Sequence, residues 1–180
     1  MILVDWQIGK YIAKGKIGVE PFNPFSIQPN SLDVCLNSDF IEYIDGGVFD
    51  TMDKSSFSRR IIEHRNVNSF ILHPNQFVLA ETKEKITLPR NVVAQIEGKS
   101  SLARLGLTIH QTGGWIDAGF SGTITLELHN ESNRVIVLYP DMSIAQVVFH
   151  KTRRCKRAYG DGRSSHYQNQ QGVTISRYDG

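Results

Sequence analysis

A short segment in the middle of the chain combines a cation, two hydroxyls and a guanidinium within six residues. Lys99, Ser100 and Ser101 follow a glycine, and Arg104 comes three residues later. Backbone N–H groups at a helix start, hydroxyls and a cation together can bind a phosphate. A helical turn would place Ser100 and Arg104 on one side. The alternative is a serine cap and a surface arginine, and these residues alone leave both interpretations open.

A glutamate lies in the clearest strand pattern of the sequence, which runs from Thr123 to Leu128. Side chains alternate along a strand, so Thr123, Thr125 and Glu127 share the face opposite to the apolar residues. A carboxylate beside two threonines could accept and return a proton during hydrolysis. It could equally be a solvated surface residue.

A glycine-rich stretch, residues 110–122, separates these two segments. Glycines such as Gly113 allow the backbone to approach a ligand closely. Asp117 lies between apolar residues, where a buried carboxylate without partners would be costly. Trp115 fits either a ligand contact or core packing.

The last part of the chain, from about residue 159 to residue 180, is polar and rich in amides. It could be a loose terminus or a lid that orders over a bound ligand. The side chains that could take part in such a lid are Tyr159, His166 and Gln170.

Several common catalytic motifs are absent from the sequence. Zinc-dependent deaminases need His-x-Glu and Cys-x-x-Cys to hold the metal and its general acid, and the chain contains no Cys-x-x-Cys. It also lacks a P-loop, a dinucleotide-binding Gly-x-Gly-x-x-Gly and a Gly-x-Ser-x-Gly elbow. We therefore expect no zinc site of the deaminase type and no serine triad.

Length and composition predict one globular domain of ordinary size. The chain has 180 residues, 40% of them hydrophobic and 21% charged, with no repeat. No apolar run is long enough for a bilayer and no secretory signal is recognisable, so we expect a cytoplasmic protein that does not bind membranes. Cys35 and Cys155 could form a disulfide, but reduced thiols are the favoured interpretation.

The net charge of +2 is too small to indicate nucleic-acid binding. One basic run, residues 151–157, contains five cations and no acidic residue. It is either a solvated surface segment or an electropositive approach to a site for polyanions.

The pattern of apolar residues predicts a mainly β domain. A helix is expected from Asp5, which could cap it, to Gly15, and a second helical piece over 100–105. Short runs separated by turn residues predict a sandwich or barrel of the jelly-roll kind. The predicted strands are 32–36, 40–44, 70–72, 77–81, 92–96, 123–128, 135–138 and 144–149.

Two long segments and two flanking motifs resemble the dCTP deaminase family. The segments are Lys99-Ser-Ser-Leu-Ala-Arg-Leu-Gly-Leu and His110-Gln-Thr-Gly-Gly-Trp-Ile-Asp-Ala-Gly-Phe-Ser-Gly-Thr-Ile-Thr-Leu-Glu-Leu. The flanking motifs are Gln28-Pro-Asn-Ser-Leu-Asp-Val and Tyr167-Gln-Asn-Gln-Gln-Gly. The likeness extends over nearly the whole chain.

That family belongs to the superfamily of the trimeric dUTPases. The resemblance implies a single domain over 1–180 with a mainly β, dUTPase-like jelly-roll or β-clip barrel, short helices and a closing tail. It also implies a homotrimer with active sites between subunits, which binds deoxycytidine and deoxyuridine nucleotides. Mg²⁺ is expected through the nucleotide phosphates rather than in a protein cage, without zinc.

The resemblance also assigns roles to the residues that could do the chemistry. Glu127 is expected to act as general base and acid at C4 of cytosine. Ser100 and Arg104 would place the attacking water and stabilise developing charge. Lys99 and Ser101 would contact phosphates.

The glycine-rich stretch and the tail receive binding roles by the same resemblance. Asp117 would hold the sugar 3′-hydroxyl, backbone groups near Thr125 would read the cytosine edge, and Trp115 would contact substrate. Gly113 stands where most members have alanine, in the loop that helps to hold the water. The tail residues implied to reach the phosphates are Tyr159, His166 and Gln170.

The implied reaction is zinc-independent deamination of dCTP to dUTP and ammonia, in the supply of dUMP and dTTP. The segment 114–120 is more similar to bifunctional members, which also release dUMP and pyrophosphate, whereas Ala103 is similar to monofunctional ones. We expect bifunctionality, with Asp117 orienting the water that attacks the α-phosphorus.

His166 stands where a lysine is usual and is mostly neutral at pH 7. We therefore hypothesise that dCMP or dCDP is also accepted, and dTTP is expected as an inhibitor.

Two other functions stay open. A pure dUTP diphosphatase would leave Glu127 without a catalytic role, and Phe120 replaces the tyrosine usual in the dUTPase motif. A non-catalytic nucleotide-binding regulator could share the fold, since a fold alone does not decide function.

Overall fold

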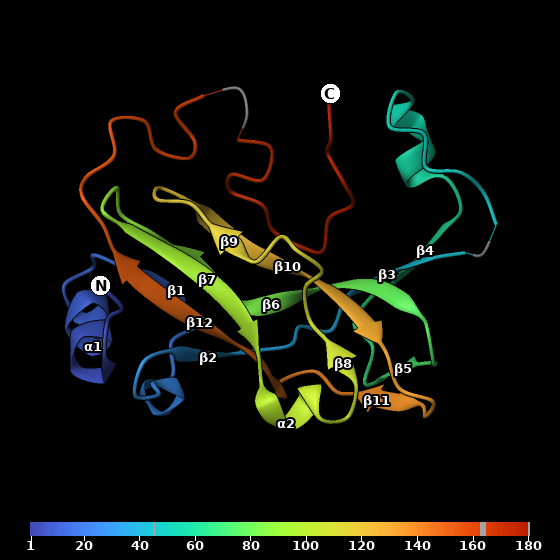
Figure 1. Ribbon diagram of the computed structural model, residues 1–180, viewed down its shortest axis with the longest axis horizontal. Helices are drawn as coiled ribbons and strands as arrows, with labels where there is room; N and C mark the ends of the chain where they lie inside the picture. Colours follow the sequence, from blue (N-terminus) through green and yellow to red (C-terminus); the bar gives the residue numbers. More distant parts are fainter. Residues whose placement is uncertain (45, 163–164, 180) are drawn as a thin grey trace.

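Two β-sheets form the body of the chain in the computed structural model, which describes residues 1–44, 46–162 and 165–179 (Figure 1). The larger sheet contains, in spatial order, β4 (Ile61–His64), β3 (Phe40–Tyr43), β6 (Phe77–Thr87), β10 (Ser121–Asn130) and β8 (Leu107–Thr108), with β1 (Gly18–Glu20) also paired to β6. The second sheet contains β2 (Leu32–Cys35), β12 (Ser143–Lys151), β7 (Val92–Gly98) and β9 (Trp115–Ile116). A small third sheet pairs β5 (Phe70–Leu72) with β11 (Ile136–Leu138). The predicted mainly β fold is confirmed.

The helices are short and lie outside the sheets. They are α1 (Asp5–Ala13), α2 (Ser100–Ala103) and two 3₁₀ turns at Pro24–Ser26 and Lys54–Ser58. The prediction that Asp5 caps α1 is wrong. Val4 is the N-cap residue, and its N–H donates to Oε1 of Gln7 at 3.1 Å. The Asp5 carboxylate accepts from the N–H of Trp6 instead. Among the described residues, no helix is long and apolar enough to cross a membrane.

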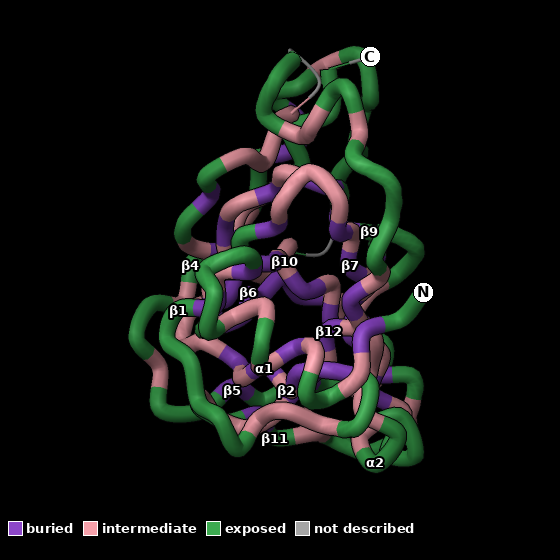
Figure 2. The backbone as a smooth tube through the Cα atoms, turned by 90° about the vertical axis from the view of Figure 1, so that its left-hand side faces the viewer, coloured by how far each residue is buried: buried purple, intermediate pink, exposed green. Residues whose placement is uncertain are grey.

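One hydrophobic core joins the two larger sheets. Phe40 of β3, Leu126 of β10 and Phe149 of β12 are fully buried and belong to the same cluster. Figure 2 shows buried residues concentrated in the strands, whereas the tail and the outer loops are mostly exposed or half-buried. The sheets therefore give a fixed frame from which the more exposed segments project.

The alternation along β10 is the part of the fold that positions polar groups. Every second residue from Gly122 to Asn130 is buried, and the residues between them are half-buried. The pairing with β6 shifts register between Thr123 and Thr125. At that irregularity the N–H of Ile124 donates to Oγ1 of Thr82 at 3.0 Å. Such irregularities re-aim side chains next to sites, here those of Thr125 and Glu127.

Predicted and observed strands differ mainly at their ends. The strand expected over 77–81 continues to Thr87, because antiparallel pairing with β1 and β10 extends over a stretch without apolar alternation. The helical piece expected over 100–105 ends at Ala103. Strands β1, β4, β8 and β9 were not predicted; three of them have only two or three residues, and β4 has no buried residue.

Candidate active site

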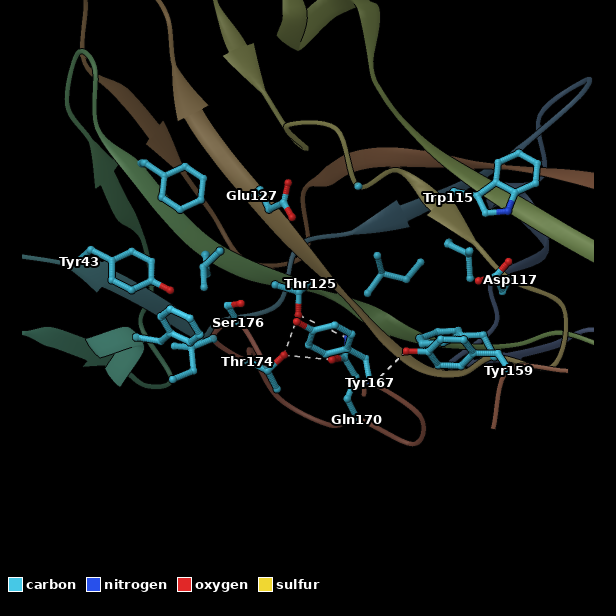
Figure 3. A pocket seen from close by; sticks show the side chains of 18 of the residues that line it. Tyr43, Trp115, Asp117, Thr125, Glu127, Tyr159, Tyr167, Gln170, Thr174 and Ser176 are labelled. Carbon is cyan, nitrogen blue, oxygen red and sulfur yellow. Dashed lines mark hydrogen bonds between the residues drawn. The ribbon is translucent and has the colours of Figure 1, made fainter. Parts of the chain in front are cut away.

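A cavity of about 560 Å³ opens between β10, β9 and the C-terminal tail (Figure 3). Seven residues that the sequence marked as site candidates line it: Gly113, Trp115, Asp117, Thr125, Glu127, Tyr159 and Gln170. These residues come from distant parts of the chain, so the fold gathers them into one place.

Glu127 projects from the polar face of β10 into this cavity. Its Oε2 accepts a hydrogen bond from the backbone N–H of Gln111 at 2.8 Å. A Cβ placed on Gly113 would lie 3.4 Å from Oε1, so the same loop closes around both carboxylate oxygens. The carboxylate is therefore held by a backbone donor while one oxygen still faces the cavity.

Trp115 and Asp117 lie together at another end of the cavity, away from Glu127 (Figure 3). Trp115 is 56% exposed, which excludes the core-packing interpretation within this chain. Asp117 follows β9 directly and is exposed, so its charge costs little. Thr125 lies between the two ends.

Aromatic rings that the sequence did not mark form much of the remaining wall. They include Tyr43, Phe77 and Tyr167, and Phe120 packs against Tyr159 with ring centroids 5.8 Å apart. A mostly apolar wall with a few polar groups is typical of a small-molecule site. Only tertiary contacts reveal these rings, since nothing in their local sequence separates them from core residues.

The tail folds onto the polar face of β10. Gln170 is 7% exposed, and its Nε2 donates to the carbonyl of Thr123 at 2.6 Å and to Oγ1 of Thr125 at 3.4 Å. Oγ1 of Thr174 donates to Oε1 of Gln170 at 3.0 Å. The hydroxyl of Tyr159 accepts from the N–H of Tyr167 at 3.0 Å. The interpretation of the tail as a loose terminus is therefore wrong for this segment.

His166 lies in the tail but does not line the cavity. Its Nε2 is 3.4 Å from a carboxylate oxygen of Asp179, and its backbone carbonyl accepts from Arg177. The expected role of His166 at the phosphates stays a prediction, and in this arrangement its ring faces the end of the tail rather than the cavity.

Lys99, Ser100 and Ser101 lie in a different groove, beside the 28–33 segment. There Nζ of Lys99 donates to Oδ2 of Asp33 at 2.5 Å. Arg104 ends α2 and lines neither the groove nor the cavity. A single chain therefore does not bring Ser100 and Arg104 to Glu127.

A buried carboxylate that the sequence did not single out lies opposite Thr125. Glu81 of β6 is 2% exposed and pairs in register with Thr125. Its Oε1 accepts from Nδ2 of Asn37 at 2.8 Å, and its Oε2 has no hydrogen-bond partner among the described residues. Burial raises the pKa of Glu81 above the ordinary value of 4.5. Its place in an apolar run, two residues after the buried Leu79, was the available signal.

A family model described as dCTP deaminase-like matches residues 2–152. The chain belongs to the dCTP deaminase-like family. A Methanosphaerula palustris protein named "dCTP deaminase, dUMP-forming" is 54% identical over 99% of this chain and 96% of its own length. A Beutenbergia cavernae protein of the same name is 42% identical over 98% of this chain and 94% of its own.

The crystal structure of a 2′-deoxycytidine 5′-triphosphate deaminase from Agrobacterium tumefaciens shares the fold. Its TM-score is 0.66 at 23% identity, and the match covers 83% of this chain. This chain spans about half of that one, since the match covers 47% of it. The family model and the shared fold confirm the predicted resemblance to the dCTP deaminase family.

Replacing Gln170 by alanine should release the tail of this dCTP deaminase-like chain. The change removes the amide that joins the tail to Thr123 and Thr125, so hydrogen-exchange protection of residues 165–175 should fall. A loss of about tenfold in nucleotide affinity, or roughly 1.4 kcal/mol, is expected. Gln171→Ala is the matched control, because Gln171 is exposed. Unchanged protection in Gln170→Ala would contradict the assigned contact.

Glu81→Gln should stabilise the protein at neutral pH. The stability linked to the raised pKa of Glu81 is fully present below pH 4.5 and is lost as the pH rises through the pKa in the folded state. Every tenfold difference in proton affinity between the folded and unfolded chain corresponds to about 1.4 kcal/mol, or roughly 3–6 °C in Tm. Thermal unfolding at pH 4, 6 and 8 should therefore show a gain that grows with pH.

Glu63→Gln, on the exposed side of β4, is the control for this measurement and should change little at any pH. A Glu81→Gln protein that is less stable than the parent at pH 8 would show that the buried carboxylate is a net stabiliser.

Proposed function

We propose that the chain is a dUMP-forming dCTP deaminase. One dCTP and two water molecules would give dUMP, pyrophosphate and ammonia. The observation that supports this proposal most strongly is the arrangement of two carboxylates in one cavity. Glu127 lies at one end, where a backbone N–H donates to it, and Asp117 lies at another end. The names of relatives that are 49–54% identical over 99% of the chain support the same reaction.

Deamination would take place at the Glu127 end of the cavity. Glu127 takes a proton from a water molecule as the oxygen of that water attacks C4 of cytosine. Glu127 then delivers this proton to N3. The carboxylate then moves the proton of the new C4 hydroxyl to the amino group, and breaking the C4–N bond releases ammonia and leaves the C4 carbonyl of uracil. The sequence contains no Cys-x-x-Cys, which zinc-dependent deaminases use to hold their metal, and we assign the proton transfers to Glu127.

Hydrolysis of the triphosphate would take place nearer to Asp117. Its carboxylate is exposed to the cavity and lies beside Trp115. We assign to it the orientation of the water that attacks the α-phosphorus, as well as a contact to the 3′-hydroxyl. The α–β bridging bond then breaks and pyrophosphate leaves.

A second copy of the chain would complete the site. Ser100 and Arg104 fit the role of placing water and stabilising charge, but the fold of one chain keeps them away from Glu127. In a homotrimer the Lys99–Arg104 segment of the neighbouring copy would cover the open side. Lys99 and Ser101 would then exchange contacts with Asp33 and water for contacts with phosphates.

Mg²⁺ fits this site only as an ion that arrives with the nucleotide. Within the described residues no three acidic, histidine or cysteine side chains cluster as a metal cage. Mg²⁺ prefers phosphate and water oxygens and would neutralise charge on the triphosphate. Asp117 is the carboxylate of the cavity placed to meet such an ion.

The tail would set the preference for phosphate length. His166 faces Asp179 rather than the cavity, which supports weak discrimination between dCTP, dCDP and dCMP. Equal turnover rates with dCTP, dCDP and dCMP would support this proposal most strongly. Turnover of dCTP alone would contradict it. dTTP inhibition is proposed on the family resemblance only.

Glu127→Gln should abolish deamination. The amide cannot take a proton from water, so ammonia release should fall by about 10²–10⁴-fold. Glu131→Gln is the matched control, because Glu131 is exposed and follows the same strand. Hydrolysis of dUTP should persist in Glu127→Gln. Full ammonia release by Glu127→Gln would contradict the assignment, whereas a parent that cleaves dUTP without releasing ammonia would be a pure diphosphatase.

Mixing two inactive variants should restore activity if sites form between copies. Ser100→Ala and Glu127→Gln each lack one half of the site, and random mixed trimers would regain about one quarter of the intact sites. Ammonia release after co-refolding measures this directly. If mixed trimers form but ammonia release does not recover, Ser100 and Glu127 either belong to the same copy's half of the site or do not both belong to the site.

A further inference from the structure

The basic segment Lys151–Arg157 has no part in the cavity chemistry described above. It carries five cations and no acidic residue, whereas the whole chain has a net charge of only +2. The rest of the chain therefore has a net charge of −3. The positive excess of this protein is concentrated in seven consecutive residues at the end of β12.

The charges of these five side chains are open to solvent. All five residues are exposed, and none of their side chains pairs with a described carboxylate. The backbone beneath them is fixed, since the N–H groups of Thr152 and Cys155 donate to the carbonyls of Asn91 and Arg90 at 2.9 Å. The charge is thus presented from a definite place rather than from a loose tail.

The segment leads directly to the active-site cavity. It leaves the end of β12 and continues into the tail, which passes above β9 and β10 (Figure 1). Arg157 lines a second cavity of about 710 Å³ together with Asp117 and Tyr159. Asp117 and Tyr159 also line the active-site cavity, so the two cavities share a wall.

We propose that residues 151–157 form an electropositive entry surface that draws the nucleotide's phosphates toward the cavity. The proposal rests on the function proposed above, because it takes the triphosphate as the ligand. A row of unpaired cations beside a cavity raises the local concentration of an anion and its association rate, by about 10–10³-fold. It adds nothing to the chemical step, so its effect belongs in kcat/KM and not in kcat.

Ionic strength separates this role from a structural one. Charges act over about 30 Å at 0.01 M salt but only about 3 Å at 1 M. A structural role of the arginine stems would not fade with added salt. The expected signature is therefore a defect that is large at low salt and absent at high salt.

The test compares two triple variants of equal net charge. Arg153→Gln/Arg154→Gln/Lys156→Gln neutralises the entry surface but leaves Arg157 and both cavities intact. Lys10→Gln/Lys14→Gln/Lys16→Gln neutralises three exposed cations of the α1 region, which line neither cavity. kcat/KM for dCTP and the binding of tripolyphosphate are measured from 0.01 to 1 M salt.

The entry-surface variant should lose about tenfold in kcat/KM at 0.01 M salt with kcat unchanged, and should equal the parent at 1 M. The control variant should follow the parent throughout. Equal kcat/KM for parent and entry-surface variant at 0.01 M would overturn the proposal. So would loss of oligonucleotide binding with dCTP kinetics intact, which would make the segment a nucleic-acid contact.

A parent enzyme that turns over no deoxycytidine nucleotide would instead refute the proposed function. In that event, salt-dependent tripolyphosphate binding that the entry-surface variant loses would still support an anion-binding surface. An entry-surface variant that fails to fold is replaced by Arg153→Gln/Arg154→Gln, which neutralises two exposed side chains only.

Discussion

The site depends first on the strict alternation of β10. Its apolar side chains are fixed in the core between the sheets, so Thr125 and Glu127 must face the cavity. A slip by one residue would bury the carboxylate and expose Leu126. The hydrogen bond from Gln111 then holds Glu127 in place, and Gln170 bonds to the same face of the strand. Core packing and site geometry are therefore one constraint.

Much of this arrangement, but not all of it, could be predicted from the sequence. Period-two alternation placed Glu127 and Thr125 on one face, and the resemblance to the dCTP deaminase family implied that Gly113, Trp115 and Asp117 lie near them. The aromatic wall escaped prediction because its rings come from distant segments of the chain, whereas Glu81 was overlooked although it lies in an apolar run. The N-cap of α1 was placed one residue late because residue type favours an Asp side chain as the cap, whereas the backbone of Val4 occupies that position. Strand ends were extended by pairing partners that local sequence does not contain.

The polar groups of the proposed site divide between two places on one chain. Glu127, Asp117 and the tail share a cavity, while Lys99 and Ser100 lie in a groove where Asp33 neutralises the lysine. This separation is a structural reason to expect a trimer, since each copy would supply the groups that its neighbour lacks. It also means that assembly, and not folding alone, would create a catalytic site. The exposed cations of 151–157 add a long-range attraction to this short-range arrangement.

The most direct measurement is the product analysis of purified protein with dCTP and Mg²⁺ in water enriched in ¹⁸O. We expect ammonia, dUMP and pyrophosphate in equal amounts, with one ¹⁸O at C4 of uracil and a second in dUMP or pyrophosphate. A product that stops at dUTP would remove the second step and the role given to Asp117. No ammonia and no label at C4 would contradict the central claim that Glu127 directs water to cytosine.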